Sequence, residues 1–219
     1  VLAATFFDRP SHVVAQDLVG AVLRRRFQGF WLAVCIVETE AYYREEKGSH
    51  ASLGRTPSRE ALWASPGTIY MYYSRAGDSL NISVEGQGNA VLIKGGRPWV
   101  DDRSGEDALE AMHTLNPGRS GRRTDERLVA GQTLVATALD LRVPEWTGKP
   151  FGPDFFVEDV GYRPRSLVCC RRLGIPTGRD EDLMLRYVDV DHVRSATQNP
   201  LTKRAWVEGR DYDLLPGRA

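Results

Sequence analysis

A long, mostly apolar strand pattern between Trp31 and Tyr42 constrains the fold of this chain more than any other feature. Gln28-Gly29 precedes it and joins it to another strand pattern that starts at residue 22, as in a β-hairpin. The period of two along a strand puts four side chains on one face: Ile36, Glu38, Glu40 and Tyr42. Two carboxylates and an aromatic ring are therefore expected to point the same way from one strand of a sheet.

Helix and strand patterns alternate along the rest of the chain without a regular β-α-β rhythm. Helices are expected over 11–19, 104–115 and 133–139, with Ser11 capping the first and a Ser104-x-x-Asp107 capping pattern opening the second. Strands are expected over 68–73, 91–94, 155–160, 167–170 and 183–188, and a polar loop over 43–60. This interleaving favours an α+β fold in which residues 1–219 form a single compact domain, with helices around a mostly antiparallel, curved sheet.

The charge of the chain is balanced, with 29 basic and 29 acidic residues and a formal net charge of zero. That balance argues against a polyanion binder driven by overall charge, but it leaves local patches open. Only four of the basic residues are lysines, and the arginines that form the rest suit phosphate oxygens, although high-GC coding produces the same bias. No apolar run approaches the roughly 20 residues of a membrane span, so a cytoplasmic protein without a membrane partner is expected.

The three cysteines, Cys35, Cys169 and Cys170, include no C-x-x-C pair. Adjacent cysteines on a strand point to opposite faces and do not form the usual corner of a zinc site. We therefore expect buried small side chains in a reducing compartment and no metal.

Glu38 and Glu40 are candidates for acid–base chemistry. A carboxylate in a partly dry site beside another carboxylate binds its proton more tightly, which suits a general base for water. Two solvated glutamates, or two partners for arginines, would give the same pattern.

Tyr70 and Tyr72 fall on one face of the strand expected over 68–73, and Tyr73 falls on the other. Tyrosines and a histidine such as His50 can stack a planar base that has left the helix. Ordinary packing of the tyrosines and a solvated histidine are the alternatives.

Several short motifs occur in a fixed order along the chain. They are Phe6-Phe7-Asp8-Arg9-Pro10, Ile36-Val37-Glu38-Thr39-Glu40-Ala41-Tyr42, His50, Arg55-Thr56-Pro57, Pro66-Gly67-Thr68-Ile69-Tyr70-Met71-Tyr72, Leu80-Asn81-Ile82-Ser83, Val91-Leu92-Ile93, Arg172-Leu173-Gly174-Ile175 and Leu185-Arg186-Tyr187-Val188. Together they resemble the alkyladenine (3-methyladenine or methylpurine) DNA glycosylase family over about residues 5–195, which leaves a tail from Ala196 beyond the resemblance.

The resemblance implies an enzyme that binds double-stranded DNA and flips out alkylated or deaminated purines. It then hydrolyses the N-glycosidic bond with a water that a glutamate activates, starting base excision repair. The resemblance also implies a monomer without a cofactor or metal, acting on DNA in the bacterial nucleoid.

The resemblance assigns roles by position. Glu40 matches the general base, and the carbonyl of Leu173 matches a ligand of the attacking water. The stacked base lies between residues that match Tyr42, His50 and Tyr72. Asn81 matches the residue that obstructs the exocyclic amine of guanine, and Leu92 matches a wall of the pocket.

The chain departs from the family pattern at two places. Lys94 stands where the family usually has an arginine near the attacking water. A lysine keeps the positive charge but lacks the planar, forked guanidinium group of arginine. Such a lysine could also attack the sugar and form a Schiff base. The hairpin over 73–78 is about one residue shorter than usual, so Tyr73 and Arg75 are both candidates for the wedge that fills the hole in DNA.

Arginine clusters are candidates for contacts with the DNA backbone. The basic loop with Arg119, Arg122 and Arg123 is the first, and Arg172 near the second half of the pocket belongs to the next. Surface arginines that are merely solvated would give the same pattern.

Two other functions fit parts of the pattern. A carbohydrate glycosidase could use Glu38 and Glu40 as its carboxylate pair, although one strand rarely presents an acid and a base to opposite faces of a sugar. A non-catalytic sensor of damaged DNA is the second alternative, if Lys94 fails to support water activation.

Overall fold

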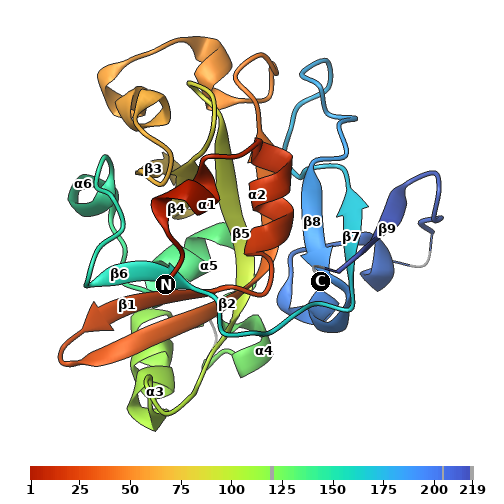
Figure 1. Cartoon of the computed structure of the whole chain (residues 1–219). Helices are drawn as coiled ribbons and strands as arrows, with labels where there is room; N and C mark the ends of the chain where they lie inside the picture. Colours follow the sequence, from red (N-terminus) through yellow and green to blue (C-terminus); the bar gives the residue numbers. More distant parts are fainter. Residues whose placement is uncertain (119–120, 204, 218–219) are drawn as a thin grey trace.

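The computed structural model describes residues 1–118, 121–203 and 205–217 (Figure 1). Within these residues, nine strands form one sheet, and every pairing between them is antiparallel. The strands are β1 (Val22–Phe27), β2 (Phe30–Tyr42), β3 (Ile69–Ser74), β4 (Gly77–Ser83), β5 (Ala90–Pro98), β6 (Phe155–Glu158), β7 (Ser166–Cys170), β8 (Arg186–Asp189) and β9 (Tyr212–Pro216). The α+β fold with a mostly antiparallel sheet is confirmed.

The 13-residue strand β2 is the centre of the sheet. The strand order is β3-β4-β5-β2-β8-β7-β9, and β1 pairs with both β2 and β6. Gln28 and Gly29 have φ angles of 49° and 96°, so the β1–β2 hairpin turns through two residues with positive φ, as a type I′ turn requires. Register shifts on both sides of Glu38 mark a bulge, which bends the strand on its way to the site.

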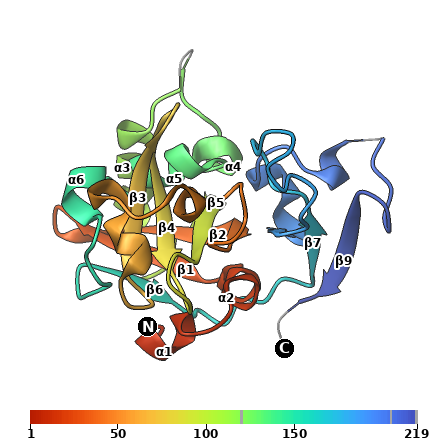
Figure 2. The ribbon, with the colours of Figure 1, turned by 90° about the horizontal axis from the view of Figure 1, so that it is seen from above.

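Short helices cover both faces of the sheet. The α-helices are α1 (Ala4–Phe7), α2 (Ser11–Leu18), α3 (Glu106–Leu115), α4 (Asp125–Leu128), α5 (Gln132–Ala138) and α6 (Val143–Trp146). The 3-10 helices are η1 (His50–Leu53), η2 (Pro57–Trp63), η3 (Val190–Ser195) and η4 (Pro200–Thr202). Figure 2 shows α2 on one side of β2, β4 and β5, and α3, α4 and α5 on the other.

The face of β2 that meets α2 is closed by apolar packing. Val14, Ala15 and Leu18 of α2 are fully buried in the main core, and the Thr39 hydroxyl donates a 2.8 Å hydrogen bond to the Ala15 carbonyl. Thr39 therefore faces α2, which leaves the opposite face of the same strand for Glu40.

Both expected helix caps are corrected by the structure. Pro10 is the N-cap of α2; the Ser11 hydroxyl instead donates to the Ala90 carbonyl and accepts from the Tyr42 N–H, which joins α2 to β2 and β5. Gly105 is the N-cap of α3, and the Ser104 hydroxyl bonds Asp101 and the Trp99 carbonyl. In both cases the serine hydroxyl forms hydrogen bonds outside the helix that the pattern expected it to cap.

Four elements, β4, α1, α4 and α6, lie outside every expected helix or strand range. The segment expected as a loop over 43–60 contains η1 and the start of η2, and the expected strands that end at Val160 and begin at Leu183 are shorter at those ends. The tail beyond Ala196 adds β9 to the edge of the sheet through pairing with β7. All three cysteines are buried and free, as expected.

No helix among the described residues is both long enough and apolar enough to span a membrane.

Leu23→Ala tests the core under β2. Leu23 on β1 is fully buried, so we expect the truncation to lower the free energy of unfolding by about 2–5 kcal/mol. Leu53 is 56% exposed, and Leu53→Ala is the matched control, expected within about 0.5 kcal/mol of the parent. Urea unfolding followed by circular dichroism measures both, and equal losses would contradict the assigned core.

Candidate active site

A single row of residues crosses the sheet and forms the floor of the candidate site. Register pairs Tyr70 with Asn81, Asn81 with Leu92, and Leu92 with Glu40, from β3 to β2. The row continues through Arg186 on β8 and Cys170 on β7 to Tyr212 on β9. Paired residues in a sheet point to the same face, so one face carries all of these side chains.

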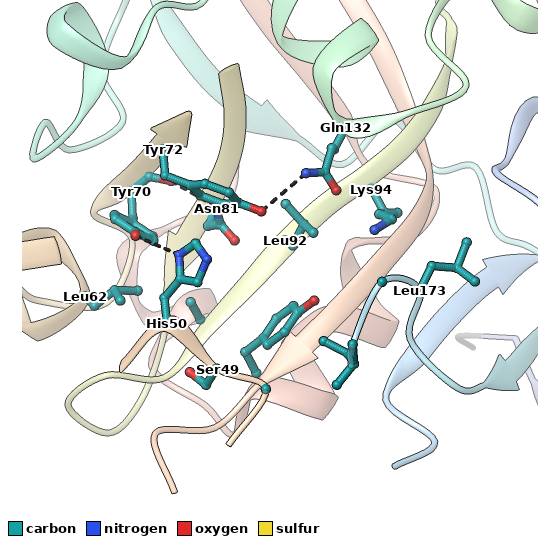
Figure 3. A pocket seen from close by; sticks show the side chains of 15 residues that line it. Ser49, His50, Leu62, Tyr70, Tyr72, Asn81, Leu92, Lys94, Gln132 and Leu173 are labelled. Atoms are coloured by element: carbon teal, nitrogen blue, oxygen red, sulfur yellow. Dashed lines mark hydrogen bonds between the residues drawn. The ribbon is translucent and has the colours of Figure 1, made fainter. Parts of the chain in front are cut away.

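A cavity of about 300 Å³ lies over this row (Figure 3). Its size is at the lower end of the range for small-molecule pockets. Its lining residues come from β2, β3, β4, β5, α5, η1, η2 and the segments before η1 and after β7: Tyr42, Gly48, Ser49, His50, Leu62, Tyr70, Tyr72, Asn81, Ala90, Leu92, Lys94, Gln132, Leu173, Gly174 and Ile175. The structure thus brings together seven residues whose roles follow from the family resemblance: Tyr42, His50, Tyr72, Asn81, Leu92, Lys94 and Leu173.

Glu40 lies beneath the lining, with none of its surface exposed. Its carboxylate accepts three hydrogen bonds: at Oε2 from the Tyr42 hydroxyl (2.7 Å) and Lys94 Nζ (3.3 Å), and at Oε1 from the Leu173 N–H (3.0 Å). A carboxylate has about four lone-pair positions, so about one remains for a further donor.

The charge of Glu40 is stabilised in spite of its burial. Burial alone would raise the pKa of Glu40, but Lys94, Arg186 and the Leu173 N–H outweigh it and lower that pKa below its ordinary value of 4.5. Burial and the neighbouring Glu40 raise the pKa of Tyr42 well above 10, so Tyr42 remains a hydrogen-bond donor to the carboxylate. Glu40 is therefore an ionised carboxylate at neutral pH.

Three aromatic side chains form the opposite wall of the cavity. The rings of Tyr70 and Tyr72 stack with centroids 6.0 Å apart, and His50 meets Tyr72 edge-on at 4.3 Å. His50 Nδ1 lies 3.0 Å from the Tyr70 hydroxyl (Figure 3). Burial and the charge of Arg59 lower the pKa of His50, so its imidazole is neutral at pH 7. The wall presents uncharged aromatic surface, which suits a planar ring.

Gln132 is a lining residue that the sequence analysis did not identify. Gln132 Nε2 donates to the Tyr72 hydroxyl (3.3 Å) and to the Ser79 hydroxyl (2.9 Å), and so holds Tyr72 against β4 (Figure 3). Tyr70, which the sequence analysis placed on one strand face with Tyr72, lines the cavity, and its carbonyl accepts from the Asn81 side chain at 3.3 Å. No pattern in the sequence marks Gln132, because its contacts depend on the packing of α5 against β4.

Glu38 occupies a separate, fully buried position. Its Oε1 accepts from Arg186 Nε at 2.6 Å, and the Thr197 N–H and hydroxyl donate to its two oxygens. The interpretation of Glu38 as a partner for an arginine is correct, and neither glutamate is solvated. Because Glu38 is enclosed by these donors, it does not supply the second carboxylate that a carbohydrate glycosidase would need.

The candidate DNA contacts lie in different environments. Tyr73 on β3 is 68% exposed, and Arg75 is exposed in the turn that links β3 to β4. Arg122 is exposed and paired with Glu110 through both oxygens, and Arg123 is half-buried. Arg119 lies outside the described residues.

The expectation that Arg172 contacts phosphate is wrong. Its side chain is fully buried, forms an ion pair with Glu46, and donates to the Ala41 carbonyl at 2.9 Å. Its guanidinium lies over the Tyr42 ring, 4.5 Å from the centroid. Arg172 therefore supports the pocket from behind.

Among the described residues, no three His, Cys, Asp or Glu side chains come close enough together to hold a metal ion.

Known proteins resemble this chain over almost its whole length. The family described as Methylpurine-DNA glycosylase (MPG) matches residues 5–193. Proteins from Pseudomonas aeruginosa and Pseudomonas syringae are each 56% identical, covering 98% and 96% of this chain and 90% and 95% of their own lengths. A protein from Methanocella arvoryzae is 32% identical over 84% of this chain and 88% of its own. Each carries the name "Putative 3-methyladenine DNA glycosylase". On this evidence, the chain belongs to the methylpurine-DNA glycosylase family.

Proposed function

We propose that this protein flips alkylated and deaminated purines out of duplex DNA and releases them by hydrolysis, with Glu40 as the general base. The observation that carries the proposal is a buried, ionised carboxylate at the base of a cavity with an aromatic wall. The family and the names of the relatives support a DNA glycosylase with 3-methyladenine among its substrates.

The chemistry of the reaction fits the charges around Glu40. A purine alkylated at N3 or N7 carries a positive charge, so the bond from its nitrogen to C1′ of the sugar is weakened. That bond breaks with its electron pair moving to the purine, and the sugar develops oxocarbenium character that a nearby carboxylate stabilises. Water attacks C1′ while its proton passes to Glu40, and the products are the free base and an abasic site.

The attacking water has a defined place beside the carboxylate. Glu40 retains about one lone-pair position beyond its three donors, and Lys94 and Leu173 flank the carboxylate from the cavity side. A water there would donate to Glu40 and to the Leu173 carbonyl. Lys94 donates to the carboxylate and favours its ionised form in the resting enzyme, and the ionised Glu40 then stabilises the positive charge that develops on the sugar.

The aromatic residues select for a planar base that has left the duplex. Tyr42 on β2 faces a cavity whose other wall contains His50 and Tyr72, so a base between them stacks on both sides. Flipping costs a few kcal/mol and costs least for damaged or poorly paired bases, which adds a first selection step. Tyr73 or Arg75 would fill the space that the base vacates, and Arg119, Arg122 and Arg123 would contact phosphates of the DNA; we expect a monomer to suffice.

Glu40→Gln tests the general base. The amide keeps the shape and removes the proton acceptor, so we expect release of 3-methyladenine to fall about 10²–10⁴-fold while DNA binding persists. Alkali cleavage of duplexes that carry 3-methyladenine, hypoxanthine or ethenoadenine measures the abasic product. Glu85→Gln, at an exposed glutamate, is the matched control.

Undiminished release by Glu40→Gln would overturn the assignment of the base. Binding without release from any lesion by the unaltered protein would favour the damaged-DNA sensor.

The role of Lys94 is tested by trapping with borohydride. An ammonium held 3.3 Å from a buried carboxylate is a poor nucleophile, so we expect no covalent adduct with DNA during base release. Lys94→Arg should keep most activity because it keeps the charge, whereas Lys94→Met should lose it. An adduct that forms with the parent and disappears in Lys94→Arg would show that the enzyme also attacks the sugar.

Asn81→Ala tests the selection against guanine. Asn81 is buried between Tyr70 and Leu92, and its loss opens space where the exocyclic amine of guanine would sit. We expect release of 7-methylguanine relative to 3-methyladenine to rise at least about tenfold, the scale of a steric sieve. Competition between the two lesions in one duplex measures the ratio, and an unchanged ratio would rule out this role.

A further inference from the structure

The row of residues across the sheet does not stop at Glu40. Arg186 on β8 is its direct register partner, and no surface of Arg186 is exposed. Its Nε donates to Glu38, and its Nη2 donates to the Thr197 hydroxyl (3.0 Å) and the Gln198 carbonyl (2.8 Å). Nη1 is buried without a hydrogen-bond partner among the described residues. The guanidinium is thus anchored on one side only.

Glu38 and the C-terminal segment enclose this guanidinium. Thr197 donates to both oxygens of Glu38, through its N–H at 2.8 Å and its hydroxyl at 2.7 Å. A Cβ at Gly95 would lie only 3.0 Å from Glu38 Oε2, so the glycine leaves room for the carboxylate. Thr197 and Gln198 lie after the last residue of the family match, residue 193.

We propose that Arg186 is a positioning residue that keeps Glu40 ionised, and that Glu38, Thr197 and Gln198 exist in this arrangement to hold its charge behind the site. The inference rests on the proposed role of Glu40 as general base. A charge that is removed from water interacts strongly with its neighbours because little solvent screens it, so a fully enclosed guanidinium beside Glu40 acts on that carboxylate.

The other groups that face Glu40 are accounted for. Four of them lie on strands: Lys94 on β5, Tyr42 on β2, Tyr72 on β3 and Cys170 on β7. The fifth is Arg172, which lies behind the Tyr42 ring. Tyr42, Tyr72 and Cys170 remain neutral because burial raises the pKa of each. Arg172 is ion-paired with Glu46, and its guanidinium lies over the Tyr42 ring and has no hydrogen bond to Glu40 among the described contacts. Lys94 and Arg186 are left as the cations that act on Glu40.

These two cations differ in their access to water. Lys94 lines the cavity, and its side chain is 11% exposed, so solvent and a bound nucleotide change its surroundings. Arg186 lies on the closed side of Glu40, where neither reaches it. Its field on the carboxylate therefore persists when DNA enters and when product leaves.

The test is the pH dependence of kcat/KM for base release by Arg186→Met. Loss of the guanidinium raises the pKa of Glu40, so we expect the acid limb to move up by about one pH unit or more, with activity recovering at high pH. Arg186→Lys keeps a positive charge, so its acid limb should return most of the way to that of the parent protein. Arg194→Met is the same change at an exposed arginine and serves as the control.

A Glu38→Gln, Arg186→Met double variant removes both members of the buried pair and covers the case in which Arg186→Met alone does not fold. It should show the same upward shift, since Arg186 rather than Glu38 is the direct partner of Glu40 in the sheet. A loss of activity that is equal at every pH, or an unmoved acid limb, would overturn the inference. An unmoved acid limb in Arg186→Met, found together with a Glu40→Gln variant that is inactive at every pH, would overturn this inference alone and leave the proposed function standing. Full activity of Glu40→Gln would overturn both.

Discussion

The charge of Glu40 is the constraint on which the site depends. A carboxylate with no exposed surface remains ionised only if the fold supplies donors and positive charge, because burial alone favours the neutral form. The fold meets this requirement from several elements at once: Tyr42 from the same strand, Lys94 from β5, Arg186 from β8 and the Leu173 N–H from the segment after β7. The apolar core makes these elements meet at one point.

The alignment of the strands in the antiparallel sheet decides whether Glu40 reaches these donors and positive charges. Tyr70, Asn81, Leu92 and Glu40 lie side by side because four strands pair with one exact alignment. A slip of one residue along β2 would send Glu40 to the face of α2 and bring Thr39 to the cavity. Thr39 instead bonds the carbonyl of Ala15, and Ser11 ties the end of β2 to α2, so both contacts help to fix the alignment.

Much of the fold and about half of the pocket lining could be predicted from the sequence, because β2 has a clear period of two and the ordered motifs mark those lining residues. Gln132 and Arg186 were not predicted as parts of the site, since their roles come from partners 53 and 148 residues away. Arg172 was misassigned for a related reason: sequence shows that a residue is charged but not whether Glu46 and Tyr42 enclose it. The hydroxyls of Ser11 and Ser104 likewise follow tertiary partners.

The most direct test of this account is a ¹³C NMR titration of the Glu40 side-chain carboxyl, assigned by comparison with Glu40→Gln. We predict a pKa below 4.5, so that the resonance keeps the shift of a carboxylate from mildly acidic to alkaline pH. A carboxyl that titrates near or above neutral pH would be a proton donor in the resting enzyme, and that result would contradict the assignment of Glu40 as the base that activates water.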